Sequence, residues 1–178
     1  MEIGVISVRY ARALLKSATI AKFENQVYKE MQSLYESYIR VPELRLAIDN
    51  PMLAKEKKQS LLKTACGIEP SELTDKFLLL VLNEGREKAL QFMAASYITL
   101  YRKQKNITRG RLITATNVTP ATEQKMKQMV ESKTQGTVEF QTEINPDIIG
   151  GFILEYDTYR MDASVKTKLN SILTQLEK

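Results

Sequence analysis

The side chains that most enzymes use for chemistry at neutral pH are scarce in this sequence. It has no histidine among its 178 residues and one cysteine, Cys66, which lies in an apolar stretch and is predicted to be a small buried hydrophobe. Ser-His and Cys-His couples are therefore excluded, and the commonest metal ligand is missing. Three aspartates, Asp147, Asp157 and Asp162, could serve a carboxylate-based hydrolase, but they lie near predicted turns, where aspartate usually caps or closes the turn. The sequence thus predicts no catalytic residue, no metal site and no cofactor.

Two adjacent glycines, Gly150 and Gly151, are the next candidates, because glycine-rich loops can hold phosphate. Such a loop needs the N-terminus of a helix directly after the glycines, since free N–H groups and the helix dipole hold the anion. Here the β-forming run "FILEY" follows, and neither Gly-x-x-x-x-Gly-Lys-Ser/Thr nor Gly-x-Gly-x-x-Gly occurs in the chain. The pair instead predicts a bulge or close backbone packing where the chain enters a β-hairpin, whose turn we expect at Asp157 and Thr158.

Helical periodicity dominates the chain up to about Lys105 and predicts about six helices with short connections. In the first of them the apolar arc is much wider than the roughly 100° stripe that a surface helix needs. The arc joins one face at helical spacing, Ile3, Ile6, Tyr10, Ala13 and Leu14, to a sector of Val8, Ala11 and Leu15, and the remaining stripe holds Arg9, Arg12 and Lys16. Such a helix is covered on two sides, by its own bundle or by a partner, and the sequence alone favours the bundle.

Residues 77–82, "FLLLVL", are apolar nearly all round a helix. This pattern predicts a central helix of the bundle, or a helix that buries one face while a partner covers the other.

The pattern changes at residues 103–110, "KQKNITRG", where polar and turn-forming residues separate two regimes. Beyond them the sequence predicts a strand, a helix, a strand, a hairpin and a last helix. The last helix carries an apolar stripe of Val165, Leu169, Ile172, Leu173 and Leu176. We therefore predict an α plus α/β chain, with a six-helix bundle domain in residues 1–105 and a small mixed α/β domain in residues 106–178.

The positive charge of the chain lies entirely in the first of these domains. Residues 1–105 contain 17 Lys and Arg against 12 Asp and Glu, whereas residues 106–178 contain nine of each. This bias is mild, well below that of a typical nucleic-acid-binding protein, and a solvated basic face explains it.

The stretch "INPDIIGGFILEY", continued by "RMDASVKTKLNSIL", resembles the C-terminal signature of the delta subunit of F-type ATP synthases. The mitochondrial counterpart of that family is the oligomycin-sensitivity-conferring protein. The structural signature is carried here by Gly150, Gly151, Asp162 and Ser164, while Asn145 and Ala163 depart from the usual aspartate and glycine. "RYARAL" is similar to the Tyr-Ala-x-Ala-Leu of the first helix of the family and "LLLVLNEGR" to its fifth helix, so the resemblance extends over nearly the whole chain.

The resemblance implies a protein without an active site that takes part in ATP synthesis and hydrogen ion transport. It would join the catalytic head to the peripheral stalk, as one copy per complex, so that the head does not turn with the rotor. The helical domain would receive N-terminal helices of the alpha subunits, and the small α/β domain would meet the C-terminal end of the b-type stalk subunit. Association with the membrane would occur only through the complex, peripherally, on the cytoplasmic face of the bacterial inner membrane.

The resemblance also implies where a partner helix binds, in a groove between the first and fifth helices. The expected partner-binding residues are Ile6, Tyr10, Ala13, Leu14, Phe77 and Leu80.

A small RNA-binding protein is the alternative, because strand and helix alternate in the second part of the chain. That part has no net charge, and it lacks both the aromatic strand pattern and the Gly-x-x-Gly loop that RNA-binding folds use. The sequence therefore predicts no nucleic-acid partner.

Overall fold

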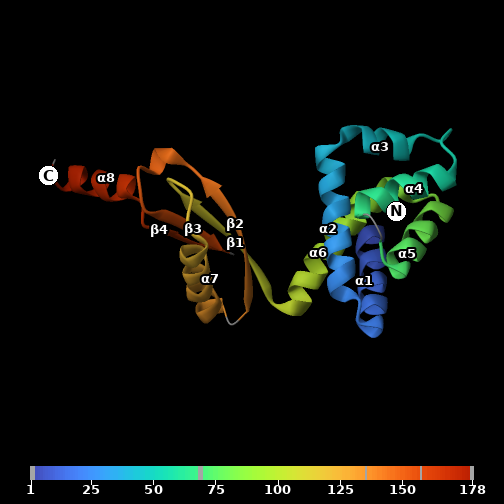
Figure 1. Cartoon of the computed structure of the whole chain (residues 1–178), viewed down its shortest axis with the longest axis horizontal. Helices are drawn as coiled ribbons and strands as arrows, with labels where there is room; N and C mark the ends of the chain where they lie inside the picture. The colour runs from blue at the N-terminus through green and yellow to red at the C-terminus, as the bar shows by residue number, and fades with distance from the viewer. Residues whose placement is uncertain (1–2, 68–69, 135, 157, 177–178) are drawn as a thin grey trace. The chain divides into compact units, whose positions relative to one another are not determined.

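The computed structural model describes residues 3–67, 70–134, 136–156 and 158–176. The chain divides into two compact units, Met1–Lys103 and Gln104–Lys178. The first unit is helical, and the second combines a four-stranded sheet with helices (Figure 1). This agrees with the predicted α plus α/β class. Within the described residues, no helix is both long and apolar enough to cross a membrane.

Six α-helices make up the described part of the first unit. They are α1 (Ile3–Ala21), α2 (Glu24–Arg40), α3 (Pro42–Asp49), α4 (Lys55–Cys66), α5 (Glu72–Asn83) and α6 (Leu90–Lys105), with a short 3-10 helix, η1 (Glu87–Ala89), before α6. Local sequence sets several of these bounds. Pro42 begins α3, where its missing N–H breaks no helical hydrogen bond. Ser71 caps α5 by accepting a hydrogen bond from the N–H of Thr74 at 3.3 Å.

Every helix of the first unit contributes to a core in which the side chains are almost fully buried. The contributors include Ala11 and Leu14 of α1, Val27, Met31 and Leu34 of α2, Ile48 of α3, Leu62 of α4, Leu78 and Val81 of α5, and Leu90, Met93 and Tyr97 of α6. Burying one large apolar side chain of this kind stabilises a fold by about 1.5–3 kcal/mol.

Helix α1 is buried along a narrower face than the sequence predicts. Its buried residues are Ser7, Ala11, Leu14, Leu15 and Ala18, several of them small enough for close helix packing. In contrast, Ile3, Val5 and Val8 are 50%, 54% and 37% exposed. The interpretation that the bundle covers both sides of this helix is therefore wrong. The neighbouring helices bury one side of α1, and part of the remaining arc stays accessible.

The second unit is built on a mixed sheet with the strand order β2-β1-β3-β4. Its elements are β1 (Ile107–Thr114), α7 (Pro120–Thr134), β2 (Thr137–Ile144), the 3-10 helix η2 (Pro146–Ile148), β3 (Phe152–Tyr156), β4 (Tyr159–Asp162) and α8 (Val165–Leu176). Strand β1 is parallel to β2 and antiparallel to β3, and β3 and β4 form the predicted hairpin. Of the residues expected at the hairpin turn, Asp157 lies outside the described residues and Thr158 is in a turn.

Successive side chains of a strand point to opposite faces of the sheet, and here both faces carry apolar side chains. Leu112 and Leu154 are paired across β1 and β3 and pack with Val130 of α7 and Val138 of β2. The next pair, Ile113 and Ile153, points to the opposite face and packs with Ile148. Helix α7 therefore covers one face of the sheet, and a smaller cluster forms on the other.

The paired glycines allow a close approach between two backbone segments. Gly151 has φ 74°, and a Cβ at this position would lie 2.2 Å from the carbonyl oxygen of Ala163. The carbonyl of Gly150 accepts a hydrogen bond from the N–H of Val165 at 2.9 Å. The prediction of close packing at the entry to the hairpin is confirmed, because the pair lies against the segment that begins α8.

Helix α8 is held at its start by the other two signature residues. Asp162 accepts hydrogen bonds from the N–H of Ser164 and the hydroxyl of Thr167, both at 3.0 Å. Ser164 is buried, and its hydroxyl oxygen accepts from the N–H of Thr167 at 3.2 Å. The hydrogen bonds that Asp162 accepts lower the pKa of its carboxyl below the usual value, and those from Ser164 are the largest cause. Ser164 is thus the residue that caps α8, and Asp162 fixes its position.

The polar segment at residues 103–110 contains the division of the chain, between Lys103 and Gln104, but it does not form the run of turns that the sequence indicates. Helix α6 continues to Lys105 and β1 begins at Ile107, so only Asn106, with φ 51°, separates them. Gly110 is already paired with Phe140 inside the sheet, and a Cβ there would lie 2.3 Å from the Phe140 ring. This glycine makes room for an aromatic side chain, which is why a residue typical of turns stands in a strand.

Replacing Gly151 with alanine is expected to destabilise the second unit by at least ~1–3 kcal/mol, because the left-handed backbone is strained for a residue with a Cβ. The Cβ would also meet the Ala163 carbonyl. Urea unfolding followed by far-UV circular dichroism measures the change. The matched control is Gly4→Ala on α1, where nothing lies within 4 Å of the added methyl group, so its stability should be unchanged or slightly raised. Equal effects from the two variants would contradict the packing described for Gly151.

Candidate functional site: an apolar groove between α1 and α5

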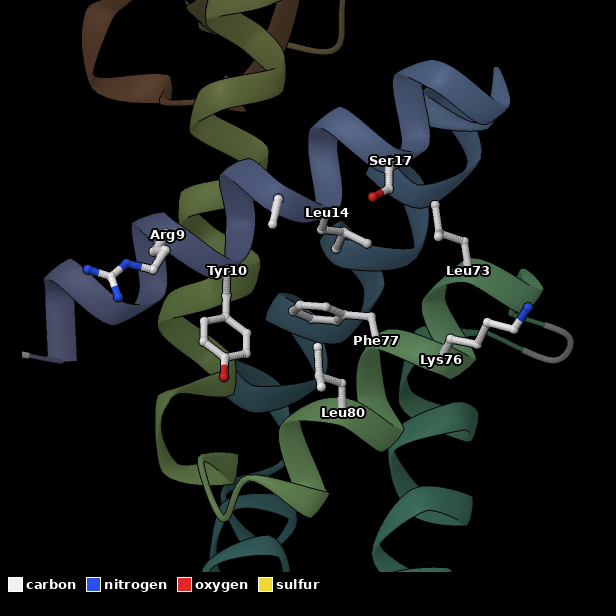
Figure 2. A pocket seen from close by; sticks show the side chains of 9 residues that line it. Arg9, Tyr10, Leu14, Ser17, Leu73, Lys76, Phe77 and Leu80 are labelled. Carbon is white, nitrogen blue, oxygen red and sulfur yellow. The ribbon is translucent and has the colours of Figure 1, made fainter.

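A hollow of about 380 Å³ lies between α1 and α5. Figure 2 shows Tyr10 and Leu14 projecting from α1 toward Phe77 and Leu80 of α5. The complete lining consists of Arg9, Tyr10, Ala13, Leu14, Ser17, Leu73, Lys76, Phe77 and Leu80. We call this surface the α1/α5 groove. Its lining is mostly apolar, and the only charged residues in the lining, among those that the structure describes, are Arg9 and Lys76.

The depth of the groove follows from the burial of its residues. Leu14 and Phe77 are 4% and 7% exposed and form the floor. Tyr10 and Leu73 are half-buried and form the walls, while Leu80 is 50% exposed. A partner that filled the groove would therefore meet a buried apolar floor and would cover apolar area now in contact with water.

Tyr10 is fixed by contacts on two sides. The guanidinium of Arg86 donates a hydrogen bond to the Tyr10 hydroxyl at 2.9 Å and lies 5.3 Å from the ring centroid. On its other side the ring meets Phe77 edge to face, with 6.5 Å between the centroids. This wall of the groove is thus ordered before any partner arrives.

The start of α5 is held by Glu30 of α2, a buried carboxylate that is 6% exposed. Its oxygens accept hydrogen bonds from the backbone N–H of Ser71 at 2.7 Å, the Ser71 hydroxyl at 2.8 Å and the Thr74 hydroxyl. A negative charge at a helix N-terminus is favoured by the unpaired N–H groups and the helix dipole. Glu30 therefore fixes the position of α5, and with it one side of the groove.

The structure brings together five of the six residues that the sequence assigns to partner binding. Tyr10, Ala13, Leu14, Phe77 and Leu80 all line the groove. Ile6 is half-buried on α1 and is not among the lining residues. Ala13 is exposed, so a side chain added there would meet solvent or a partner before it met the core.

Two residues that shape the groove were not predicted, Glu30 and Arg86. Glu30 stands between Val27 and Leu34 on the apolar stripe of α2, and a carboxylate at such a position signals a buried partner. Arg86 is separated from Tyr10 by 76 positions in the chain, and nothing in its local sequence indicates the contact.

The remaining candidates for chemistry are structural where the structure describes them. Cys66 is buried, and burial raises the pKa of its thiol to about 12, with the Glu30 carboxylate adding to the rise. Such a thiol is a poor nucleophile. No group of three or more His, Cys, Asp or Glu among the described residues is placed to hold a metal ion. Asp147 is exposed in η2, and Asp162 accepts hydrogen bonds from Ser164 and Thr167 at the start of α8.

The α plus α/β architecture and an open apolar groove between two helices together have the geometry of proteins that take an amphipathic helix into a groove. A sequence model described as the ATP synthase delta (OSCP) subunit matches residues 6–176 of the chain. The chain therefore belongs to the ATP synthase delta (OSCP) subunit family.

Relatives of the chain carry the same name. Proteins called ATP synthase subunit delta from Phocaeicola vulgatus and Parabacteroides distasonis are 49% and 44% identical to it, each over 176 residues. These alignments cover 98% of the chain and 95% of the first relative, and 99% of the chain and 98% of the second. A chain of the Toxoplasma gondii mitochondrial ATP synthase hexamer, solved by cryo-electron microscopy, matches with a TM-score of 0.63 at 23% identity over 97% of both chains. This last likeness bears on the fold alone.

Replacing Glu30 with alanine is expected to lower the free energy of unfolding by about 2 kcal/mol or more, because the Ser71 and Thr74 donors lose a charged acceptor in a buried place. Chemical denaturation of the purified chain measures the loss. Glu36→Ala on the same helix is the matched control. Glu36 is exposed and paired only with Arg40 at 3.1 Å, so its removal should change stability by less than about 0.5 kcal/mol. Equal losses from the two variants would show that Glu30 does not anchor α5.

Proposed function

We propose that this chain is the non-catalytic stator subunit that joins the catalytic head of a rotary F-type ATP synthase to its peripheral stalk. One copy would act in each complex, without a cofactor, and would keep the head from turning with the rotor. It would associate with the membrane only through the complex, on the cytoplasmic face of the bacterial inner membrane. Membership of the delta (OSCP) family supports the proposal, and the α1/α5 groove is the single observation that carries it furthest.

In this proposal the groove receives the N-terminal helix of an alpha subunit. An amphipathic helix binds by laying its apolar stripe into a matching apolar hollow, with anchors one turn apart. The half-exposed Leu80 and the wall of Tyr10 offer such a surface, and Ala13 lets a second helix approach closely because its side chain is small. The partner-binding residues proposed are thus Tyr10, Ala13, Leu14, Phe77 and Leu80, with Ile6 at the margin.

The second unit is proposed to meet the C-terminal end of the b-type stalk subunit through α8. This helix has no buried residue, although it carries an apolar stripe. The stripe consists of Val165, Leu169, Ile172, Leu173 and Leu176, which are between 38% and 78% exposed. Because a helix gains most of its stability in a protein from packing its apolar face, a stripe left in water indicates a partner.

The alternative of a small RNA-binding protein receives no support from the relatives. The two aromatic residues of β3 also oppose it, because Phe152 and Tyr156 pack against the cluster beneath α7 and offer no stacking platform. On β1, Arg111 is already paired with Glu143, to which its Nε donates at 2.9 Å.

Replacing Ala13 with aspartate tests the groove. The charge would stand in the proposed contact, so binding of an alpha-subunit N-terminal peptide should weaken at least tenfold, because an unpaired charge would be buried. The fold should survive with a loss of about 0.7 kcal/mol from helix propensity, since Ala13 is exposed. Isothermal titration calorimetry and thermal unfolding measure the two effects.

The control for this variant is Ala54→Asp. Ala54 is exposed at the N-cap of α4 and makes no capping bond, so aspartate there should keep peptide binding intact and stabilise the helix. Unfolding of Ala13→Asp would show that Ala13 belongs to the core. Normal binding by a folded Ala13→Asp would show that α1 is not part of the contact.

Replacing Leu173 with glutamate tests the role of α8. Binding of a peptide from the C-terminal end of the b-type subunit should fall at least tenfold, while the second unit stays folded because Leu173 is 57% exposed. Ser171→Glu places the same charge on the opposite side of α8 and should leave binding unchanged. Surface plasmon resonance compares the variants. Equal binding by the two would remove α8 from the proposed stalk contact.

A further inference from the structure

One edge of the α1/α5 groove is bordered by a row of positive charges on α1. Arg9, Arg12 and Lys16 follow one another at intervals of three and four residues and so lie on one side of the helix. We call these three residues the basic ridge. At 1.5 Å per residue the ridge extends for about 10 Å along the helix. Arg9 also lines the groove, so the ridge borders the apolar lining directly.

The ridge charges are not neutralised within the described residues. Arg9, Arg12 and Lys16 are exposed and form no ion pair there, and neither does Arg86, which contacts the ring of Tyr10. Lys76, on the α5 side of the groove, differs because it is paired with Glu72 at 2.6 Å. The two edges of the groove are therefore electrostatically unlike.

The groove lining itself contains no carboxylate among the described residues. A partner helix in the groove would place one of its flanks against the basic ridge and the other against the Lys76–Glu72 pair. Lysine or arginine on the first flank would face three like charges, whereas glutamate or aspartate there would be attracted. Docking opposite charges also speeds association, an effect that salt suppresses.

We infer that the helix accepted by the α1/α5 groove carries carboxylates along the edge that faces the basic ridge. This inference rests on the proposed function and adds the chemistry of the partner: an amphipathic helix with an apolar stripe bordered on one side by acidic residues. The ridge selects the rotation of the helix in the groove, because only one flank of the partner can face α1.

A helix fits these observations better than an anionic membrane, the other acidic partner that a basic helix can attract. A bilayer takes up apolar side chains that protrude from a surface. The apolar residues beside the ridge instead form a hollow whose floor, Leu14 and Phe77, is buried between two helices. A protruding apolar stripe from a partner fills a hollow, and a flat lipid surface does not.

The experiment titrates the alpha-subunit N-terminal peptide into the full chain at 50 and 500 mM NaCl by calorimetry. It compares the wild type with Arg12→Glu and with Lys57→Glu, which reverses an exposed charge on α4 that does not line the groove. Arg12 does not line the groove, so its reversal leaves the apolar contact intact. The inference predicts that high salt and Arg12→Glu each weaken binding by about three- to tenfold, while Lys57→Glu has no effect. A second peptide has its ridge-facing carboxylates changed to lysine. It should bind the wild type more weakly than the unmodified peptide does, and it should bind Arg12→Glu more tightly than it binds the wild type.

The outcomes separate this inference from the proposed function. If Ala13→Asp blocks the peptide but salt, Arg12→Glu and the lysine peptide change nothing, the groove binds a helix and the acidic edge is wrong. If the wild type does not bind the peptide at low salt, the proposed function and the inference both fall. Vesicles containing phosphatidylglycerol are the third arm. The inference would be overturned if the wild type bound these vesicles, Arg12→Glu did not bind them, and both bound the peptide equally well. The ridge would then be assigned to a membrane.

Discussion

The architecture of the first unit depends on one constraint, that α5 is apolar on more sides than the unit can cover. Phe77, Leu78, Val81 and Leu82 are buried, whereas Leu79 and Leu80 remain 39% and 50% exposed. Fully burying a leucine contributes about 1.5–3 kcal/mol. A partner that covered the exposed side of α5 would therefore gain a substantial part of this free energy on binding. The helix stays in place because its buried side packs in the core and Glu30 holds its first turn.

Preorganisation connects this constraint with function. Tyr10 accepts a hydrogen bond from Arg86 and contacts Phe77 edge to face, so the wall of the groove does not need to be ordered when a helix arrives. Ordering a mobile side chain at an interface costs about 0.5–1.5 kcal/mol, and fixed walls avoid that loss. The basic ridge then adds orientation, since apolar contacts alone do not distinguish one flank of a helix from the other.

The sequence predicted the parts of the fold that depend on local pattern. Helical periodicity located the helices of the first unit, and the Gly150–Gly151 pair was correctly predicted to pack closely at the hairpin entry. The sequence did not predict how much of α1 the bundle covers. Burial depends on which other helices pack against α1, and a helical wheel describes one helix alone. The contacts of Glu30 and Arg86 also escaped prediction, since each joins segments at least 41 positions apart. Gly110 was predicted to belong to the boundary. It stands inside β1 because it makes room for the ring of Phe140, and the local sequence does not show this contact with another strand.

The most direct test of the account is to map where an alpha-subunit N-terminal peptide binds on the full chain, by titrating it into the ¹⁵N- and ¹³C-labelled protein and following the NMR spectrum. The account predicts that the largest shift changes fall on Tyr10, Ala13, Phe77 and Leu80, with contacts between the peptide and these side chains, and that residues of the second unit are unaffected. Largest changes on α3, α4 or the sheet, with the α1/α5 groove unperturbed, would contradict it.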